Sequence, residues 1–339
     1  MKRKLLVCIV AVTMSVSVFS AGADITVKPR LEGAYNSIFN KEDFGFGLSS
    51  LYTFLDGEIT DNLSYSATFH FLSSDPESLY KYESPCLNGT WVDMAYLSYN
   101  RDLWGIDLGK VLLNFGGMTN EQDDVDCYSG LIPYNWFEFN SYQYGLTFRL
   151  TPWENHSFEA QFTTAPYMES FNDMQFAYSL CWRGEMGGYS SAWAVNGFRS
   201  YEEPDEDADE DTPLSKTTNL NIGLGNRYEF NDRWNMEFDA YLHLFDCKLY
   251  DMEYSDFYLR GGYNATENLA IQATVGIKSV KAPVFGAVVE YYPIEALRLH
   301  ASLSYCDCSG LEYGVRFNND QPFEASIGVT YALDFHLGR

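Results

Sequence analysis

The chain has 339 residues, with 47 acidic and 22 basic side chains and a formal net charge of −25 at pH 7. Such an acidic surface makes nucleic acid, itself a polyanion, an implausible partner. Aromatic residues form 17% of the chain although its mean hydropathy is only −0.24. A transmembrane β-barrel explains both values, because its polar lumen lowers the hydropathy while aromatic girdles sit at the two interfaces. The alternative is a secreted soluble β-sandwich or β-solenoid.

Residues 1–23 have the three parts of a secretory signal peptide. Lys2, Arg3 and Lys4 form a basic start, an apolar run follows, and an A-x-A site ends at Ala23. We predict cleavage after Ala23, which lowers the formal net charge of the chain from −25 to −28. The alternative, a membrane-anchor helix, needs about 20 apolar residues. We therefore expect the chain to leave the cytoplasm for the outer membrane of a Gram-negative cell.

The rest of the chain consists of alternating apolar and polar segments, the pattern of strands with one apolar face. Seven short turns rich in Asn, Asp, Gly or Pro separate some of them, at residues 60–62, 100–102, 152–155, 185–188, 231–233, 266–268 and 293–295. Other connections, most of them longer, alternate with these short turns along the chain. They lie near residues 37–43, 73–90, 114–140, 165–175, 199–218, 246–255, 279–282 and 306–322. The last segment, from Phe323 to Leu337, alternates without a break. It exceeds the roughly 9–11 residues that cross a bilayer.

Seven short turns and eight other loops join sixteen strands. Outer-membrane barrels have an even strand number, with short turns in the periplasm and long loops outside. We therefore predict one all-β domain over residues 24–339, a transmembrane antiparallel barrel of about sixteen strands. Residues 311–318 also alternate, so eighteen strands are the alternative. Its outer face is expected to contact membrane lipid and lipopolysaccharide.

A barrel of this size encloses an aqueous lumen, and the alternation assigns charged side chains to it. Those predicted to line the pore are Lys28, Arg30, Arg149, Arg183, Arg227, Arg260, Arg298, Glu159, Glu237 and Asp239. Because both signs are present, the wall alone does not decide an ion preference.

The longest connection, residues 114–140, is acidic and aromatic and contains no Lys or Arg. Its carboxylates include Glu121, Asp123, Asp124 and Asp126. A long loop without regular structure is usually functional or disordered, and the aromatic residues favour packing over disorder. We hypothesise that it folds into the pore and narrows it, with the carboxylates raising the local cation concentration. The alternative is an extracellular flap packed over the rim.

Neither cysteines nor acidic runs specify a cofactor or metal site. Six cysteines remain after cleavage, namely Cys86, Cys127, Cys181, Cys247, Cys306 and Cys308. Free or structural thiols are the preferred interpretation; among possible disulfides, Cys86 with Cys127 is the expected pair because both fall in long loops. The acidic run 202–211 lacks the Gly and closing Glu of an EF-hand. No nucleophile-elbow, phosphate-loop or dinucleotide motif occurs, so an enzyme is not expected.

Two further stretches have a strand–turn–strand pattern, residues 91–110, WVDMAYLSYNRDLWGIDLGK, and residues 284–305, VFGAVVEYYPIEALRLHASLSY. Both resemble outer-membrane porins of the phosphate-selective porin (porin O and P) superfamily. The resemblance implies a sixteen-stranded, trimeric diffusion channel whose third outer loop constricts the pore. Phosphate selectivity is not carried over, because the candidate constriction loop is wholly acidic.

The sequence thus favours passive diffusion of ions and small hydrophilic solutes, with a weak cation preference. A first alternative is a non-transporting barrel that serves as a surface receptor, adhesin or assembly component. A second is a barrel hydrolase or transferase, which would need a nucleophile within reach of a base.

Overall fold

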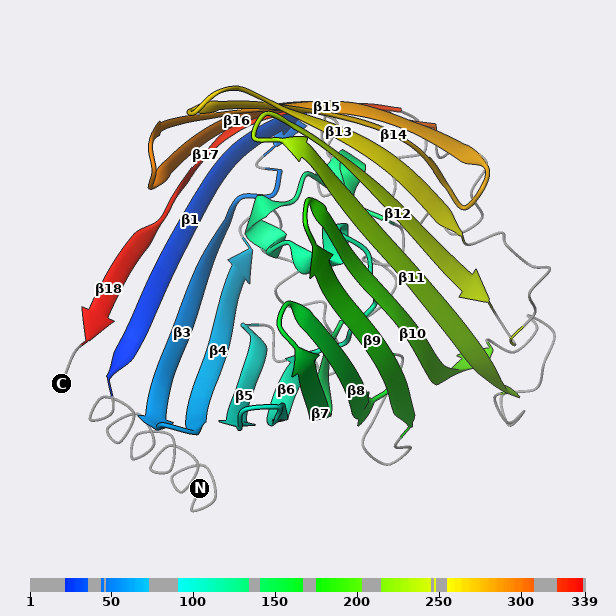
Figure 1. Ribbon diagram of the computed structural model, residues 1–339. Helices are drawn as coiled ribbons and strands as arrows, with labels where there is room; N and C mark the ends of the chain where they lie inside the picture. The colour runs from blue at the N-terminus through cyan, green and yellow to red at the C-terminus, as the bar shows by residue number, and fades with distance from the viewer. Residues whose placement is uncertain are drawn as a thin grey trace, which may run out of the picture.

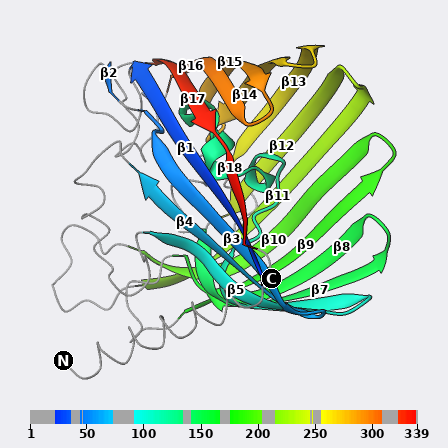
Figure 2. The ribbon, with the colours of Figure 1, turned by 90° about the vertical axis from the view of Figure 1, so that its left-hand side faces the viewer.

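Sixteen antiparallel strands close into a barrel around a central space (Figures 1 and 2). The computed structural model describes residues 22–35, 44–45, 47–72, 91–133, 141–166, 175–202, 215–244, 247, 255–307 and 322–337. The described residues contain no helix long and apolar enough to cross a membrane.

The strands follow one another around the wall in chain order. They are β1 (Ala23–Tyr35), β2 (Phe44–Gly45), β3 (Ser50–Thr60), β4 (Leu63–Leu72), β5 (Val92–Asn100), β6 (Trp104–Leu112), β7 (Tyr142–Trp153), β8 (His156–Thr164), β9 (Phe176–Met186), β10 (Tyr189–Glu202), β11 (Ser215–Asn231), β12 (Trp234–Leu244), β13 (Asp256–Thr266), β14 (Leu269–Lys278), β15 (Ala282–Ile294), β16 (Leu297–Cys306), β17 (Phe323–Tyr331) and β18 (Leu333–Leu337). Three short 3-10 turns lie between β6 and β7, namely η1 (Thr119–Glu121), η2 (Asp124–Asp126) and η3 (Ser129–Leu131).

Strand β1 closes the barrel. One edge of β1 pairs with β3, and the other edge pairs with β17 and β18. Strands β17 and β18 share one register against β1 and count as one crossing, while β2 is a two-residue pairing at the end of β1. The prediction of a sixteen-stranded antiparallel barrel is therefore confirmed. All seven predicted short turns fall between consecutive strands.

The last strand crossing, formed by β17 and β18, is interrupted, although the alternation from Phe323 to Leu337 is continuous in the sequence. The pairing of β1 with this crossing stops at Val27 opposite Leu333 and resumes at Arg30 opposite Thr330. Pro29 lies in this gap, and proline has no backbone N–H to give to a neighbouring strand. Pro29 therefore cannot donate a backbone hydrogen bond at this position.

The two faces of the wall follow the predicted alternation. On β7, Leu146, Phe148 and Leu150 are 38%, 41% and 39% exposed on the outer surface, whereas Gln143 and Thr147 are 3% and 2% exposed inside. Leu299 and Leu303 of β16 are likewise exposed, with Arg298 and His300 buried.

Strand β12 departs from this pattern at its far end. Alternation places on the outer face Trp234, Met236, Phe238, Ala240, Leu242 and Leu244. The first three are exposed, but Ala240 and Leu244 are buried and Leu242 is half-buried. The outer face of β12 is therefore less exposed toward this end.

Some of the predictions concern segments outside the described residues. These are residues 1–21 of the predicted signal peptide, the connections 37–43 and 73–90, residues 134–140 of the predicted constriction loop, the acidic residues 203–211 and the alternating stretch 311–318.

The expected pairing of Cys86 with Cys127 is wrong. Cys127 is a thiol, not half of a disulfide, and it is 3% exposed. Its Sγ lies 3.6 Å from the carbonyl oxygen of Asp123 in the same loop. The prediction assumed a surface position for a residue that is buried in the loop. Cys306 is disulfide-bonded, and Cys181 and Cys247 are thiols.

The face assignment predicts an asymmetric response to an added charge. Leu146→Arg places a guanidinium on the outer face near mid-strand and should lower the free energy of unfolding by about 2–4 kcal/mol. Gln272→Arg adds the same group on the inner face of β14 and should cost less than about 1 kcal/mol. Urea unfolding in lipid vesicles measures both values, and equal losses would contradict the assignment.

Candidate functional site

Residues 113–133 lie inside the barrel. After β6 the chain turns inward and forms η1, η2 and η3, drawn in teal within the ring of strands (Figure 1). Hydrogen bonds and ion pairs join it to inward-facing groups of β1, β8, β9, β10, β12, β15 and β16. We call residues 113–133 the lumen loop.

The first part of the lumen loop packs against small residues of the barrel wall. A Cβ atom on Gly223 would lie 1.8 Å from the carbonyl oxygen of Phe115, and one on Gly225 would lie 2.4 Å from the amide nitrogen of Met118. The amide of Gly117 donates to the carbonyl of Ala192 on β10 at 2.9 Å. Small residues on β10 and β11 therefore let loop backbone lie directly on strand backbone.

Asp239 of β12 fixes the first turn of the loop. Its carboxylate accepts hydrogen bonds from the amide of Met118 at 2.6 Å, the amide of Thr119 at 3.1 Å and the hydroxyl of Thr119 at 2.7 Å. Arg260 lies on the neighbouring strand and donates to the same carboxylate at 2.7 Å. A buried carboxylate is stable only when it is paired and hydrogen-bonded, and these donors meet that need.

Two arginines of the opposite wall hold the far part of the loop. Arg30 and Arg298 both donate to the carbonyl oxygen of Val125, each at 2.9 Å. Arg30 also donates to the carbonyl of Cys127 at 2.7 Å and pairs with Glu32. Because the donors come from β1 and β16, the loop spans the lumen between two parts of the wall.

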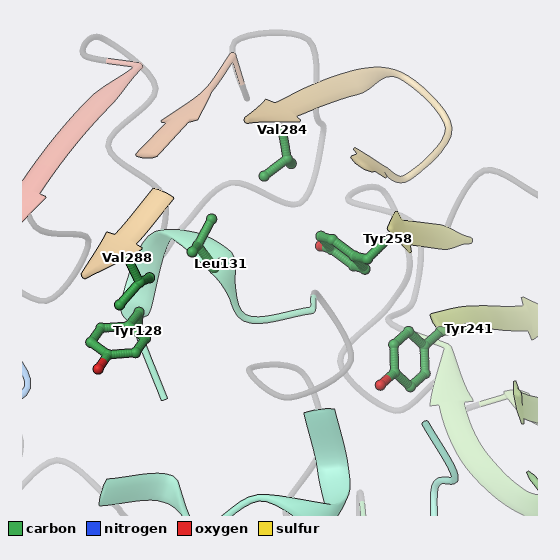
Figure 3. Packing of buried hydrophobic residues seen from close by; sticks show 6 residues of the cluster. All are labelled: Tyr128, Leu131, Tyr241, Tyr258, Val284 and Val288. Carbon is green, nitrogen blue, oxygen red and sulfur yellow. The ribbon is translucent and has the colours of Figure 1, made fainter. Parts of the chain in front are cut away.

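An apolar cluster seals the loop against β12–β15. The side chains are Tyr128 and Leu131 from the loop, and Tyr241, Tyr258, Val284 and Val288 from the strands (Figure 3). Figure 3 shows Tyr128 and Leu131 on the teal ribbon, with Val288 beside Tyr128. Close packing of these groups excludes water from this part of the lumen.

The predicted pore-lining residues face inward, and the arginines among them are paired with carboxylates. Arg227, Glu237 and Arg260 lie directly opposite one another on β11, β12 and β13. Further pairs join Arg149 to Asp107 and Glu159, Arg183 to Glu159 and Glu121, and Arg298 to Asp126 and Glu290. The inner wall is therefore a band of neutralised pairs, which no single-residue pattern in the sequence specifies.

Three of the four predicted loop carboxylates form ion pairs with basic side chains of the barrel wall. Glu121 pairs with Arg183 at 2.7 Å, Asp123 with Lys28 at 2.9 Å and Asp126 with Arg298 at 2.6 Å. Their side chains are still 32%, 47% and 36% exposed. The side chain of Asp124 lies outside the described part of the structure.

Sequence reasoning missed the groups around Tyr128. The hydroxyls of Tyr128 and Tyr292 both donate to the carboxylate of Glu290. Burial, and next the nearby Glu290 charge, raise the pKa of Tyr128 well above its usual range, so the phenol stays protonated. The alternation places Glu290 and Tyr292 on the inner face of β15, but it cannot show that loop residue Tyr128 reaches them.

Histidines offer no evident catalytic arrangement in the described residues. His70 contacts Asp93, His300 contacts Glu32, and His336 contacts Asp24. No group of three or more His, Cys, Asp or Glu residues suited to a metal ion occurs in the described ranges. These contacts fit polar lining better than a nucleophile–base pair.

Several solved outer-membrane barrels are similar to this structure. A double mutant of the Rh. blastica porin matches 92% of this chain and 100% of its own chain, with 14% identity and a TM-score of 0.62. OmpF of Salmonella typhi, in complex with daunomycin, matches 93% of this chain and 98% of its own, with 12% identity and a TM-score of 0.61. The trimer form of OmpT, an outer membrane protein of Vibrio cholerae, matches 92% and 100%, with 15% identity and a TM-score of 0.59.

At these identities the likeness establishes the fold alone. No protein-family model matches the sequence, and no curated protein matches it.

The Asp239 contacts predict a large effect from removing one charge. Asp239→Asn should lower the free energy of unfolding by about 3–5 kcal/mol, because it leaves the buried Arg260 without its nearest carboxylate. The amides of Met118 and Thr119 should exchange faster with deuterium. Urea unfolding and hydrogen exchange measure the two effects.

Glu229→Gln is the matched control. Glu229 pairs with Arg227 at 3.2 Å but is 55% exposed, so its loss should cost about 0–1 kcal/mol. If Asp239→Asn behaved like this control, Asp239 would not be an anchor of the lumen loop.

Proposed function

We propose that the chain forms an outer-membrane porin for passive diffusion of ions and small hydrophilic solutes. The proposal rests on one observation. The inner wall is charged, and the lumen loop contacts only part of it. The loop contacts β8–β12 and β15, β16 and β1. A cavity of about 490 Å³ lies beside β3–β5, with further lining from the start of β1 and from β18. Asp56, Ser66, Tyr96 and Ser98 border that cavity. A polar cavity on this side suits hydrated solutes.

We further propose a weak cation preference. The carboxylates of Glu121, Asp123 and Asp126 remain partly exposed although they are paired. Carboxylates at a narrow point raise the local concentration of cations. Arg183, Lys28 and Arg298 beside them limit this effect, so the expected preference is small.

The remaining proposals concern family, assembly and export. The stretches 91–110 and 284–305 favour a distant relationship to the phosphate-selective porin superfamily, without its phosphate selectivity. A homotrimer is proposed because a trimer form exists among the similar structures. Export by a signal peptide cleaved after Ala23 would leave Asp24 at the N-terminus, and no enzymatic activity is proposed.

A non-transporting receptor, adhesin or assembly component is the second candidate. The apolar cluster of Tyr128, Leu131 and their strand partners favours it, because this cluster closes one part of the lumen. The two candidates differ in whether the β3–β5 side of the lumen conducts ions.

Conductance of the reconstituted protein decides between them. Residues 24–339 in a planar bilayer should give steady, ohmic single-channel steps in potassium chloride. Silence from a folded, heat-modifiable barrel would overturn the porin proposal and favour the receptor or assembly role.

The cation preference predicts a charge-dependent reversal potential. In a potassium chloride gradient, the combined Glu121→Gln and Asp123→Asn variant should lower the cation-to-anion permeability ratio by roughly twofold, because two loop charges are lost. Asp232→Asn, in a periplasmic turn, is the control and should leave the ratio unchanged. An unaltered ratio in the double variant would remove the lumen loop as the source of selectivity.

A further inference from the structure

A second hollow lies beneath the lumen loop. It lies on the other side of the barrel from the cavity beside β3–β5. Its volume is about 500 Å³, within the range of about 300–1,000 Å³ that is typical of small-molecule sites. Asn235, Asn264 and Ala270 border it near the periplasmic turns. We call this hollow the vestibule chamber.

The lumen loop borders the chamber at its outer end. Its lining includes Tyr128, Leu131 and Ile132 of the lumen loop, which are buried, and Val288 of β15. Tyr128, Leu131 and Val288 belong to the apolar cluster that seals the loop to the wall (Figure 3). The loop and this cluster therefore form part of the chamber wall.

The chamber walls carry balanced charges. Four basic and four acidic side chains border it. Arg227 lies 3.4 Å from Glu237, Arg260 lies 3.7 Å from Glu237, and Arg298 lies 3.4 Å from Glu290. Because the charges are already paired, the chamber has no net attraction for a simple cation or anion.

The same pairs leave a dense set of hydrogen-bonding groups. Guanidinium and carboxylate groups alternate from strand to strand across the sheet, at Arg227 of β11, Glu237 of β12 and Arg260 of β13. Gln272 and the phenol of Tyr292 add donors and acceptors, and Tyr292 also gives an aromatic ring. Paired charges offer strong hydrogen bonds to hydroxyl groups, while an aromatic ring can pack against the C–H face of a sugar.

We propose that the vestibule chamber binds a neutral saccharide of one or two sugar units. This inference rests on the proposed function only for the route that brings the sugar to the chamber. A zwitterionic solute such as a dipeptide is less favoured, because each of its charges would compete with an ion pair that is already formed. Binding itself needs no ion current.

Calorimetric titration of the detergent-solubilised full mature chain with maltose tests the proposal. Maltose should bind, and Ala270→Trp, which fills the chamber from the inner face of β14, should weaken binding at least about tenfold. Ala273→Trp adds the same side chain on the exposed outer face of β14 and should change affinity by less than about twofold.

The outcomes separate this inference from the porin proposal. Conductance without maltose binding would overturn the saccharide proposal and leave the porin proposal intact. Maltose binding without conductance would overturn the porin proposal and leave the saccharide proposal intact. Equal effects of Ala270→Trp and Ala273→Trp would place maltose elsewhere. Binding of glycylglycine but not maltose would overturn the saccharide assignment.

Discussion

Backbone pairing within the hydrocarbon is the constraint on which the structure depends. An unpaired N–H or C=O group in lipid costs several kcal/mol, so a sheet that crosses the membrane must close on itself. Here β1 meets that requirement by pairing with β3 on one edge and with β17 and β18 on the other. Closure then fixes two faces, an apolar outer one and an inner one that can hold charge.

The inner face uses its charges to organise the lumen. Asp239 and Arg260 fix one part of the lumen loop, and Arg30 and Arg298 fix another through the carbonyl of Val125. The loop consequently lies over the hollow that Arg227, Glu237 and Arg260 border, and a separate polar cavity lies beside β3–β5. The proposed transport and the proposed saccharide binding therefore concern different parts of one lumen.

Local patterns were enough to predict the wall. Alternation separated Leu146 from Thr147, and turn chemistry marked the seven short connections, because both signals lie within a few neighbouring residues. The length and aromatic content of residues 114–140 suggested a folded loop, but its path depends on distant partners such as Gly223 and Asp239. The Cys86–Cys127 pairing failed for the same reason, since spacing alone could not show that Cys127 is buried. Pro29 was visible in the sequence, but its position opposite the interruption between β17 and β18 became evident only from the register.

The central claim is that the lumen loop narrows the channel, and the conductance of a loop-deleted barrel tests it most directly. Removal of residues 118–132, in a variant that still folds and shows heat modifiability, should raise the single-channel conductance while leaving steps of one size. An unchanged conductance would mean that the loop does not limit the passage and would contradict the account.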